Sequence, residues 1–242
     1  MKTHTFRLIA CAIALVTVFA SCKKDNENDD KKPEITVPES WDAGDWGTAS
    51  FATTGVWIVG SQAWSDAVTT TMTSGKTTFE SKNMSEGTFL ADGCSNPDRK
   101  GDLFSWEMVN QFGNVLCPEG WRVPTKGDFE TLNTELGGAE FLEEDPDRDI
   151  EVVKAFISAT YINSEKWGGE ISGAKPAMQA PRQEGQVWFW SSTEADANSA
   201  NVLRLMYREA TEGSSATASI YIGNLGCMKD AGGSLRCVKD VE

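Results

Sequence analysis

The sequence predicts an α+β fold, because helical periodicity and strand-like patterns occupy different parts of the chain. Helical spacing of apolar residues occurs between positions 103 and 158, whereas the segments after Gln186 alternate and are separated by clusters of Gly, Asn and Ser. Antiparallel strands are predicted there over residues 187–192, 202–208, 218–222 and 235–240. An earlier strand pair is predicted over residues 56–59 and 62–64, with Gly60 and Ser61 as its turn. Helices followed by runs of strands are typical of α+β domains.

The clearest helix is predicted over residues 125–136. Phe129, Leu132 and Leu136 recur at i, i+3 and i+7, so they share one face, which is expected to point to the core. Thr125 is a suitable N-cap, and two glycines follow the last apolar residue. Two further helices are predicted from weaker repeats over residues 103–111 and 150–158.

Composition already excludes several classes of function. The 242 residues are 40% hydrophobic, which is enough to build a core, and the formal net charge is −14 with a pI near 4.6. Nucleic-acid binders need a basic surface, so the chain is not expected to bind nucleic acid. The one histidine, His4, lies in a segment predicted to be removed. The mature chain therefore lacks the residue on which catalytic triads and most zinc sites depend.

Residues 1–21 are predicted to be a lipoprotein signal peptide. Lys2 and Arg7 precede an apolar run over residues 8–19, and small residues and Cys22 follow it. The run is shorter than the roughly 20 residues that a helix needs to cross a bilayer. The letters FASC before and at Cys22 resemble the bacterial lipobox, which implies cleavage before this cysteine and its acylation. The alternative is an ordinary signal peptide with a chance cysteine.

Residues 22–44 are predicted to be an acidic, flexible tether, because they are polar and have almost no apolar periodicity. The run KKDNENDD behind Cys22 resembles the export tag of Bacteroidetes-type lipoproteins, which implies the outside of the outer membrane; a generic charged linker is the alternative. Loss of residues 1–21 removes two bases and no acid, so the net charge becomes −16. Residues 45–242 are predicted to form a single domain, since no later break divides the chain.

Three stretches of sequence carry a resemblance to a known family. They are CPEGWRVPT followed by DFETL between positions 117 and 132, FWSSTE at 189–194, and LRCVKD at 235–240. Together they strongly resemble the Fibrobacter succinogenes major paralogous domain over about residues 55–240, and residues 141–185 depart from its pattern. The resemblance implies a C-type-lectin-like fold in which two helices pack on antiparallel strands, stapled by disulfides. The family occurs in secreted and surface lipoproteins and has no defined general activity.

Four cysteines remain after Cys11 and Cys22 are set aside: Cys94, Cys117, Cys227 and Cys237. Outside the cytoplasm they predict two disulfides, for which the sequence leaves three connectivities open. The resemblance to C-type-lectin-like domains implies a Cys117–Cys237 bridge, which leaves Cys94 with Cys227. There is no CxxC pair, so a zinc site is not expected. No metal site and no cofactor are predicted for the chain.

The large aromatic residues Trp121, Trp188 and Trp190 are predicted to lie in the core, with a sugar-stacking platform as the alternative for them. The acidic run at 145–149 has oxygen spacing that suits calcium, but it lacks the glycine and the twelfth-position acid of an EF-hand, so an EF-hand is excluded and a loose calcium loop is the alternative left open. The calcium-binding sugar motifs of true lectins are absent. Glu119, Glu130 and Glu194 are the conceivable carboxylate pairs of a hydrolase, and surface or capping roles are the expected alternative.

These observations predict a lipid-anchored protein of the outer membrane, exposed at the cell surface, whose domain binds or displays a partner without catalysing a reaction. The membrane is contacted through the lipid on Cys22. The ligand stays open between a glycan, a host protein and another surface subunit such as a fimbrial one. The alternatives are a structural envelope component and a hydrolase or modifying enzyme on a lectin-like fold.

Overall fold

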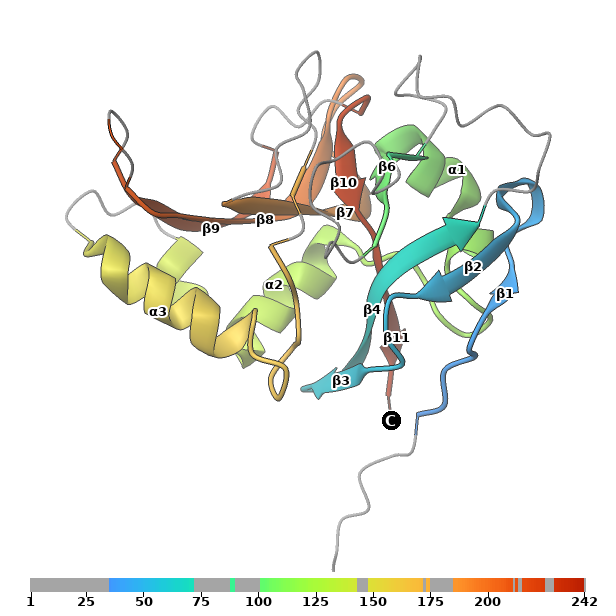
Figure 1. The fold of residues 1–242 in the computed structure, drawn as a ribbon, viewed down its shortest axis with the longest axis horizontal. Helices are drawn as coiled ribbons and strands as arrows, with labels where there is room; N and C mark the ends of the chain where they lie inside the picture. The colour runs from blue at the N-terminus through green and yellow to red at the C-terminus, as the bar shows by residue number, and fades with distance from the viewer. Residues whose placement is uncertain are drawn as a thin grey trace, which may run out of the picture. The chain divides into compact units, whose positions relative to one another are not determined.

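Two β-sheets and three α-helices make up the part of the chain that the computed structural model describes (Figure 1). That part comprises residues 35–71, 88–89, 101–142, 148–171, 173–174, 185–210, 212, 215–224 and 229–241. The combination of helices and sheets confirms the predicted mixture of α and β elements. The predicted signal peptide, Cys22 and the first part of the predicted tether lie outside the described residues.

The first sheet is built around β4 (Gln62–Thr71), which pairs antiparallel with three other strands. These are β2 (Thr48–Phe51), β3 (Val56–Val59) and β11 (Arg236–Asp240), and β1 (Trp41–Asp42) pairs with β2. The β3–β4 hairpin confirms the predicted strand pair, and Gly60 supplies the positive φ of 58° in its turn. The last strand of the chain therefore lies beside one of the first (Figure 1).

The second sheet has the strand order β5-β6-β10-β7-β8-β9 in the described residues. Its strands are β5 (Thr88–Phe89), β6 (Leu103–Ser105), β7 (Gln186–Glu194), β8 (Ala200–Arg208), β9 (Thr217–Gly223) and β10 (Gly232–Ser234). Strands β7, β8 and β9 confirm three of the predicted strands. The expectation that all strands pair in antiparallel fashion is wrong at one pair. Strand β10 runs parallel to β7, where Ser234 pairs with Phe189.

The predicted strand over residues 235–240 is confirmed as β11 apart from its first residue, and a further short strand, β10 of the second sheet, comes directly before it. β10 ends before the buried Leu235 and β11 begins after it, so the chain passes from one sheet to the other at this residue. Glycines allow β10 to approach β7 closely, since a Cβ atom on Gly233 would lie 2.8 Å from Nε1 of Trp190. Those same glycines give no strand signal in the sequence, which is why the sequence analysis missed β10.

The described residues form three α-helices: α1 (Trp106–Leu116), α2 (Lys126–Glu135) and α3 (Ile150–Thr160). The resemblance implied two. Helix α2 confirms the predicted bounds, with Thr125 as its N-cap. Helix α3 confirms the weaker prediction over residues 150–158. It lies within the segment 141–185, which departs from the pattern of the family.

The helix predicted over residues 103–111 is wrong at its start. Residues Leu103–Ser105 pair with β10 and form strand β6, although Leu103 and Phe104 fit the helical spacing equally well. Helix α1 begins only at Trp106, where the hydroxyl of Ser105 accepts a hydrogen bond from the N–H of Met108 at 3.3 Å. Pairing with a strand distant in sequence decides the local conformation here.

The core consists of two clusters on opposite faces of the second sheet. Alternate residues of β7 point to different clusters, so Trp188 and Trp190 pack with α1, and Val187 and Phe189 pack with α2 and α3. Figure 1 shows α2 and α3 beneath β8 and β9, and α1 beside β6 and β10. The predicted core residues Trp121, Trp188 and Trp190 are all buried.

The predicted inner face of α2 is also confirmed. Phe129 and Leu132 are fully buried, and Leu136 packs on the same cluster at its edge. At the other end of the described chain, Ile35, Val37 and Trp41 are partly buried against the first cluster. The described fold therefore includes residues 35–44, the last part of the segment predicted as a tether.

Candidate functional site

A buried disulfide organises the region that holds the candidate site. Cys117 follows α1 as its C-cap residue, Cys237 lies in β11, and the Cα atoms of the bonded pair are 5.8 Å apart. Both residues are buried, with exposed fractions of 2% and 0%. This is the pairing that the resemblance implies. Cys94 and Cys227 lie outside the described residues, so their predicted bond stays a prediction.

The chain turns sharply after this disulfide. The N–H of Trp121 donates to the carbonyl of Pro118 at 2.9 Å, which closes a four-residue turn. Gly120 holds the third position with a φ of 80°, the conformation that a type II turn requires there. The turn directs Trp121 and Arg122 towards β11.

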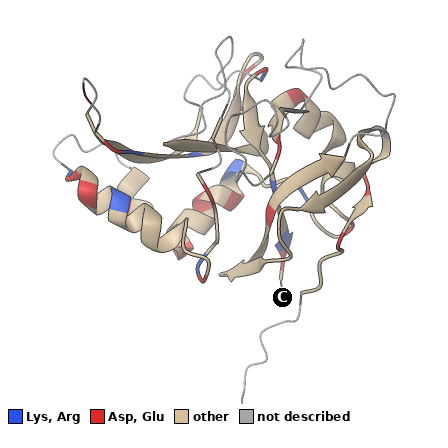
Figure 2. Ribbon diagram, viewed as in Figure 1, with Lys and Arg blue, Asp and Glu red and all other residues tan. Residues whose placement is uncertain are grey.

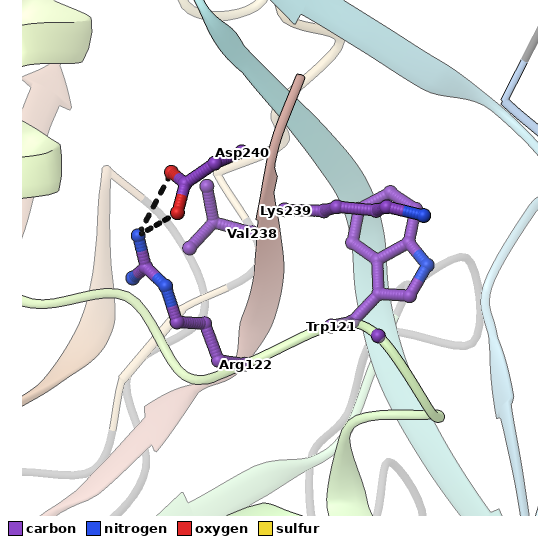
Figure 3. Close-up of a pocket in the computed structure, with 6 residues that line it drawn as sticks. Trp121, Arg122, Val238, Lys239 and Asp240 are labelled. Carbon is purple, nitrogen blue, oxygen red and sulfur yellow. Dashed lines mark hydrogen bonds and ion pairs between the residues drawn. The ribbon is translucent and has the colours of Figure 1, made fainter. Parts of the chain in front are cut away.

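Arg122 then pairs with the outer edge of β11. Its N–H donates to the carbonyl of Val238 at 2.9 Å, and its carbonyl accepts from the N–H of Val238 at 2.8 Å. No further backbone hydrogen bond joins residues 120–121 to 239–240 among the described residues. A pocket of about 370 Å³ adjoins these two segments; it is lined by Gly120, Trp121, Arg122, Val238, Lys239 and Asp240 (Figure 3).

One carboxylate, that of Asp128, holds this region together. It accepts from Nη1 and Nη2 of Arg122 at 2.5 and 3.0 Å, and from Nε2 of Gln62 at 2.7 Å. The N–H and hydroxyl of Thr125 donate to it at 2.6 and 2.8 Å, which completes a capping box at the start of α2. The turn, helix α2 and strand β4 therefore meet at a single buried anion.

The electrostatics of Asp128 follow from these contacts. Burial raises the pKa of its carboxyl group, but the hydrogen bonds from Arg122 and Thr125 outweigh burial and hold the pKa below its usual range. The hydrogen bond to Asp128 likewise raises the pKa of Arg122. Both groups are charged at neutral pH and satisfy each other, which leaves neither available as a proton donor or acceptor for a substrate.

The two sides of β11 offer different chemistry. On one side, Nη2 of Arg122 lies 3.1 Å from the carboxylate of Asp240, which is 72% exposed (Figure 3). On the other side, the side chain of Lys239 extends past the indole of Trp121 (Figure 3). Lys239 forms no ion pair with any residue in the described ranges.

Three of the five lysines in the described residues, Lys126, Lys154 and Lys229, form ion pairs, whereas Lys166 and Lys239 form none. Figure 2 shows Lys and Arg at isolated positions among the Asp and Glu residues. Around the pocket, Lys239 can donate hydrogen bonds and Asp240 can accept them, while Trp121, a core residue that is 8% exposed, forms part of the apolar wall. This combination suits the recognition of a ligand that carries both hydroxyl or charged groups and apolar faces.

Two of the other acids singled out in the sequence, Glu130 and Glu194, form ion pairs. Glu194 forms an ion pair with Lys229, whose ammonium also lies 4.7 Å from the ring centroid of Trp106. Glu130 pairs with Lys126 along α2 at 3.2 Å, and Glu119 is exposed on the turn. The structure thus places the three glutamates at separate positions, two of them in ion pairs and Glu119 at the surface.

The acidic run 145–149 is described only at its end. Asp149 caps α3 by accepting from the N–H of Glu151 at 2.9 Å, and residues 145–147 lie outside the described part. Within the described residues, no three His, Cys, Asp or Glu side chains lie close enough together to hold a metal ion. In the same residues, no helix is both long and apolar enough to cross a membrane.

Sequence reasoning missed Arg236, which is buried beside Trp167. Its guanidinium carbon lies 3.8 Å from the ring centroid of Trp167 and 4.9 Å from that of Trp57, and its N–H groups donate to the carbonyls of Ser65 and Trp167 at 2.5 and 2.9 Å. Burial lowers its pKa to about 9, so the group stays charged at pH 7. A lone arginine among the apolar residues of a predicted strand was the only signal for it.

The comparisons with known proteins agree with the pattern of motifs around this site. The Fibrobacter succinogenes major domain family matches residues 59–239, a span that includes both cysteines of the bridge and every residue that lines the pocket except Asp240. No curated protein and no solved structure matches the chain. Since the family match covers well over half of the sequence, the chain belongs to the Fibrobacter succinogenes major domain family.

Proposed function

We propose that this protein is a lipid-anchored cell-surface protein whose domain binds a ligand through the pocket beside the Cys117–Cys237 bridge, without catalysing a reaction on it. The observation that carries the proposal is the unpaired Lys239 next to Trp121 in a pocket whose framework is fixed by the disulfide and by Asp128. The disulfide and the Asp128 contacts tie the segments around the pocket together, and Lys239 and Asp240 at its rim are accessible to solvent, an arrangement that suits ligand recognition.

The domain itself is proposed to be C-type-lectin-like. Support comes from the disulfide that joins the loop before α2 to the last strand, as the resemblance implies, and from the pairing of β11 with β4, an early strand. Helix α3, in the segment that departs from the family's pattern, is then an addition to that plan. The fold alone does not decide function, so the ligand must be inferred from the pocket.

A glycan is the ligand class that the pocket suits best. Sugar rings present apolar C–H faces that pack on an indole, while their hydroxyl groups accept from an ammonium and donate to a carboxylate. Lys239 and Asp240 supply the polar features from the two sides of β11, and Trp121, 8% exposed, offers a small part of its indole to the pocket of about 370 Å³. A calcium ion is not required by this arrangement.

Anchoring is proposed to occur through Cys22. The lipobox-like FASC and the acidic run behind it support acylation and export to the cell surface. Mass spectrometry of the mature protein is expected to find the lipid on an N-terminal Cys22, and a Cys22→Ser variant is expected to lack it. An unmodified N-terminus in the wild-type protein would contradict this part of the proposal.

A glycan array probed with the full chain tests the binding function. Selective binding is expected for a limited set of glycans, with loss of signal in the Lys239→Ala variant. Lys126→Ala is the matched control, because it removes the same charge from a lysine that pairs with Glu130 on α2. An array without any signal would favour the structural envelope component, and equal signals for both variants would place the binding site elsewhere.

A further inference from the structure

Strand β9 forms one end of the second sheet in the described residues. Its seven residues pair with β8 without interruption, from Thr217 opposite Arg208 to Gly223 opposite Val202. In an antiparallel ladder, alternate residues direct their N–H and C=O groups away from the neighbouring strand. No backbone hydrogen bond to this outer edge of β9 is formed within the described part of the chain.

The other sheet ends are short or covered, which makes β9 distinctive. Strands β1 and β5 have two residues each, β3 has four, and the outer edge of β11 is bridged by Arg122. Natural proteins usually protect long edges by charges, prolines or bulges, because open edges recruit further strands. β9 has none of these protections, since residues 213–228 contain neither charged residues nor proline.

The edge is also held firmly in place. Ile220 is buried in the cluster that α2 and α3 cover, and Ala218 and Ile222 pack on the same cluster. Threonine, isoleucine and tyrosine, which favour strands, supply four of the seven residues of β9. A rigid, regular strand with unpaired backbone groups is the template on which another strand can add.

We propose that β9 pairs antiparallel with β9 of a second copy of this chain. A strand that pairs with itself around a two-fold axis satisfies the same backbone groups in both copies, which is the symmetry that most homodimers use. An axis at Ile220 places Ser219 of one copy opposite Tyr221 of the other on the same face of a continuous sheet. Two chains of net charge −14 repel each other, so contact through an uncharged strand is the approach with the least local repulsion.

The dimer is expected to be weak and to respond to salt. Two seven-residue strands bury little surface, which is typical of transient association. Added salt screens the repulsion between the acidic copies and therefore strengthens the dimer, whereas an interface held by ion pairs would weaken.

Sedimentation velocity of the purified full chain, at increasing protein concentration and at low and high salt, tests this proposal. The wild-type chain is expected to form a reversible dimer that high salt stabilises. A Ser219→Lys variant places a lysine on the edge strand of each copy and is expected to weaken dimerisation by roughly tenfold or more. Thr134→Lys adds the same charge at an exposed position of α2 and is the matched control.

Near-UV circular dichroism checks that each variant is folded, and Thr217→Lys replaces Ser219→Lys if the latter is not. A photocrosslinker at position 219 is expected to join β9 peptides of two copies. A wild-type chain that stays monomeric at all concentrations would overturn the proposal. A dimer that both edge variants leave unchanged, or crosslinks that map to another segment, would do the same.

Discussion

Arg122 and Asp128 form a two-point ion pair, with 2.5 Å between Nη1 and Oδ2 and 3.0 Å between Nη2 and Oδ1. The pair joins the turn behind the disulfide to the first turn of α2, and Gln62 of β4 donates to the same carboxylate. Arg122 also contacts Asp240 at the pocket. The pocket and the core are thus coupled through one buried anion.

An Asp128→Asn variant is expected to lose about 2–4 kcal/mol of unfolding free energy, because the bidentate ion pair and the capping box are lost together. Urea unfolding measures the loss. Glu130→Gln, which alters only the exposed i,i+4 pair with Lys126, is the control and is expected to cost less than about 0.5 kcal/mol. Equal losses in the two variants would show that the Asp128 contacts do not stabilise the fold.

The lowered pKa of Asp128 predicts acid sensitivity. Its stabilising contribution is fully present above the unfolded-state pKa of about 3.9, and it is lost as the pH falls through the lower pKa of the folded state. The difference in unfolding free energy between the wild type and Asp128→Asn is therefore expected to be constant above about pH 5 and to shrink below about pH 4. A difference that grows on acidification would contradict the assignment.

Removal of the Cys117–Cys237 bond is expected to cost roughly 2–5 kcal/mol, the usual loss for a disulfide in a secreted domain. The double variant Cys117→Ser and Cys237→Ser, measured by thermal unfolding, tests this. The matched pair Cys94→Ser and Cys227→Ser should leave the 117–237 peptide intact in a non-reducing map. A Cys117–Cys227 or Cys94–Cys117 peptide would refute the pairing.

An Arg236→Lys variant is expected to lose about 2–4 kcal/mol, because a lysine cannot donate to the carbonyls of both Ser65 and Trp167 while stacking on the indole. Near-UV circular dichroism is expected to change, since the variant alters the packing of Trp167. Arg208→Lys, the same exchange at an exposed residue, should leave the stability and the spectrum unchanged. Tolerance of Arg236→Lys would show that the charge alone is needed.

The helices and strands that could be predicted from the sequence are those whose own residues carry a cap, an apolar repeat or turn residues. Helix α2 has both an apolar repeat and a cap within its own sequence, so its bounds could be predicted closely. Strands β7 to β9 have alternation and turn residues of their own. Strand β6 and the break at Leu235 depend on pairing between distant segments, which no local pattern encodes.

The candidate site shows the same division. Cys117, Trp121 and Cys237 were found from their motif, and their burial follows from their chemistry. Gln62 and Asp128 are 66 positions apart, and Arg122 and Asp240 are 118 positions apart, so the network that supports the pocket is a product of the fold. Lys239 and Asp240 look like ordinary surface residues in the sequence, and only the turn at Gly120 makes them line a pocket.

Isothermal titration of the full chain with the strongest glycan from the array tests the central claim most directly. Wild type and Lys126→Ala are expected to bind with the same affinity, whereas Lys239→Ala is expected to bind about tenfold or more weakly, the effect of losing one charge-assisted hydrogen bond. Equal affinities for all three proteins would contradict the claim that the pocket beside the Cys117–Cys237 bridge is the binding site.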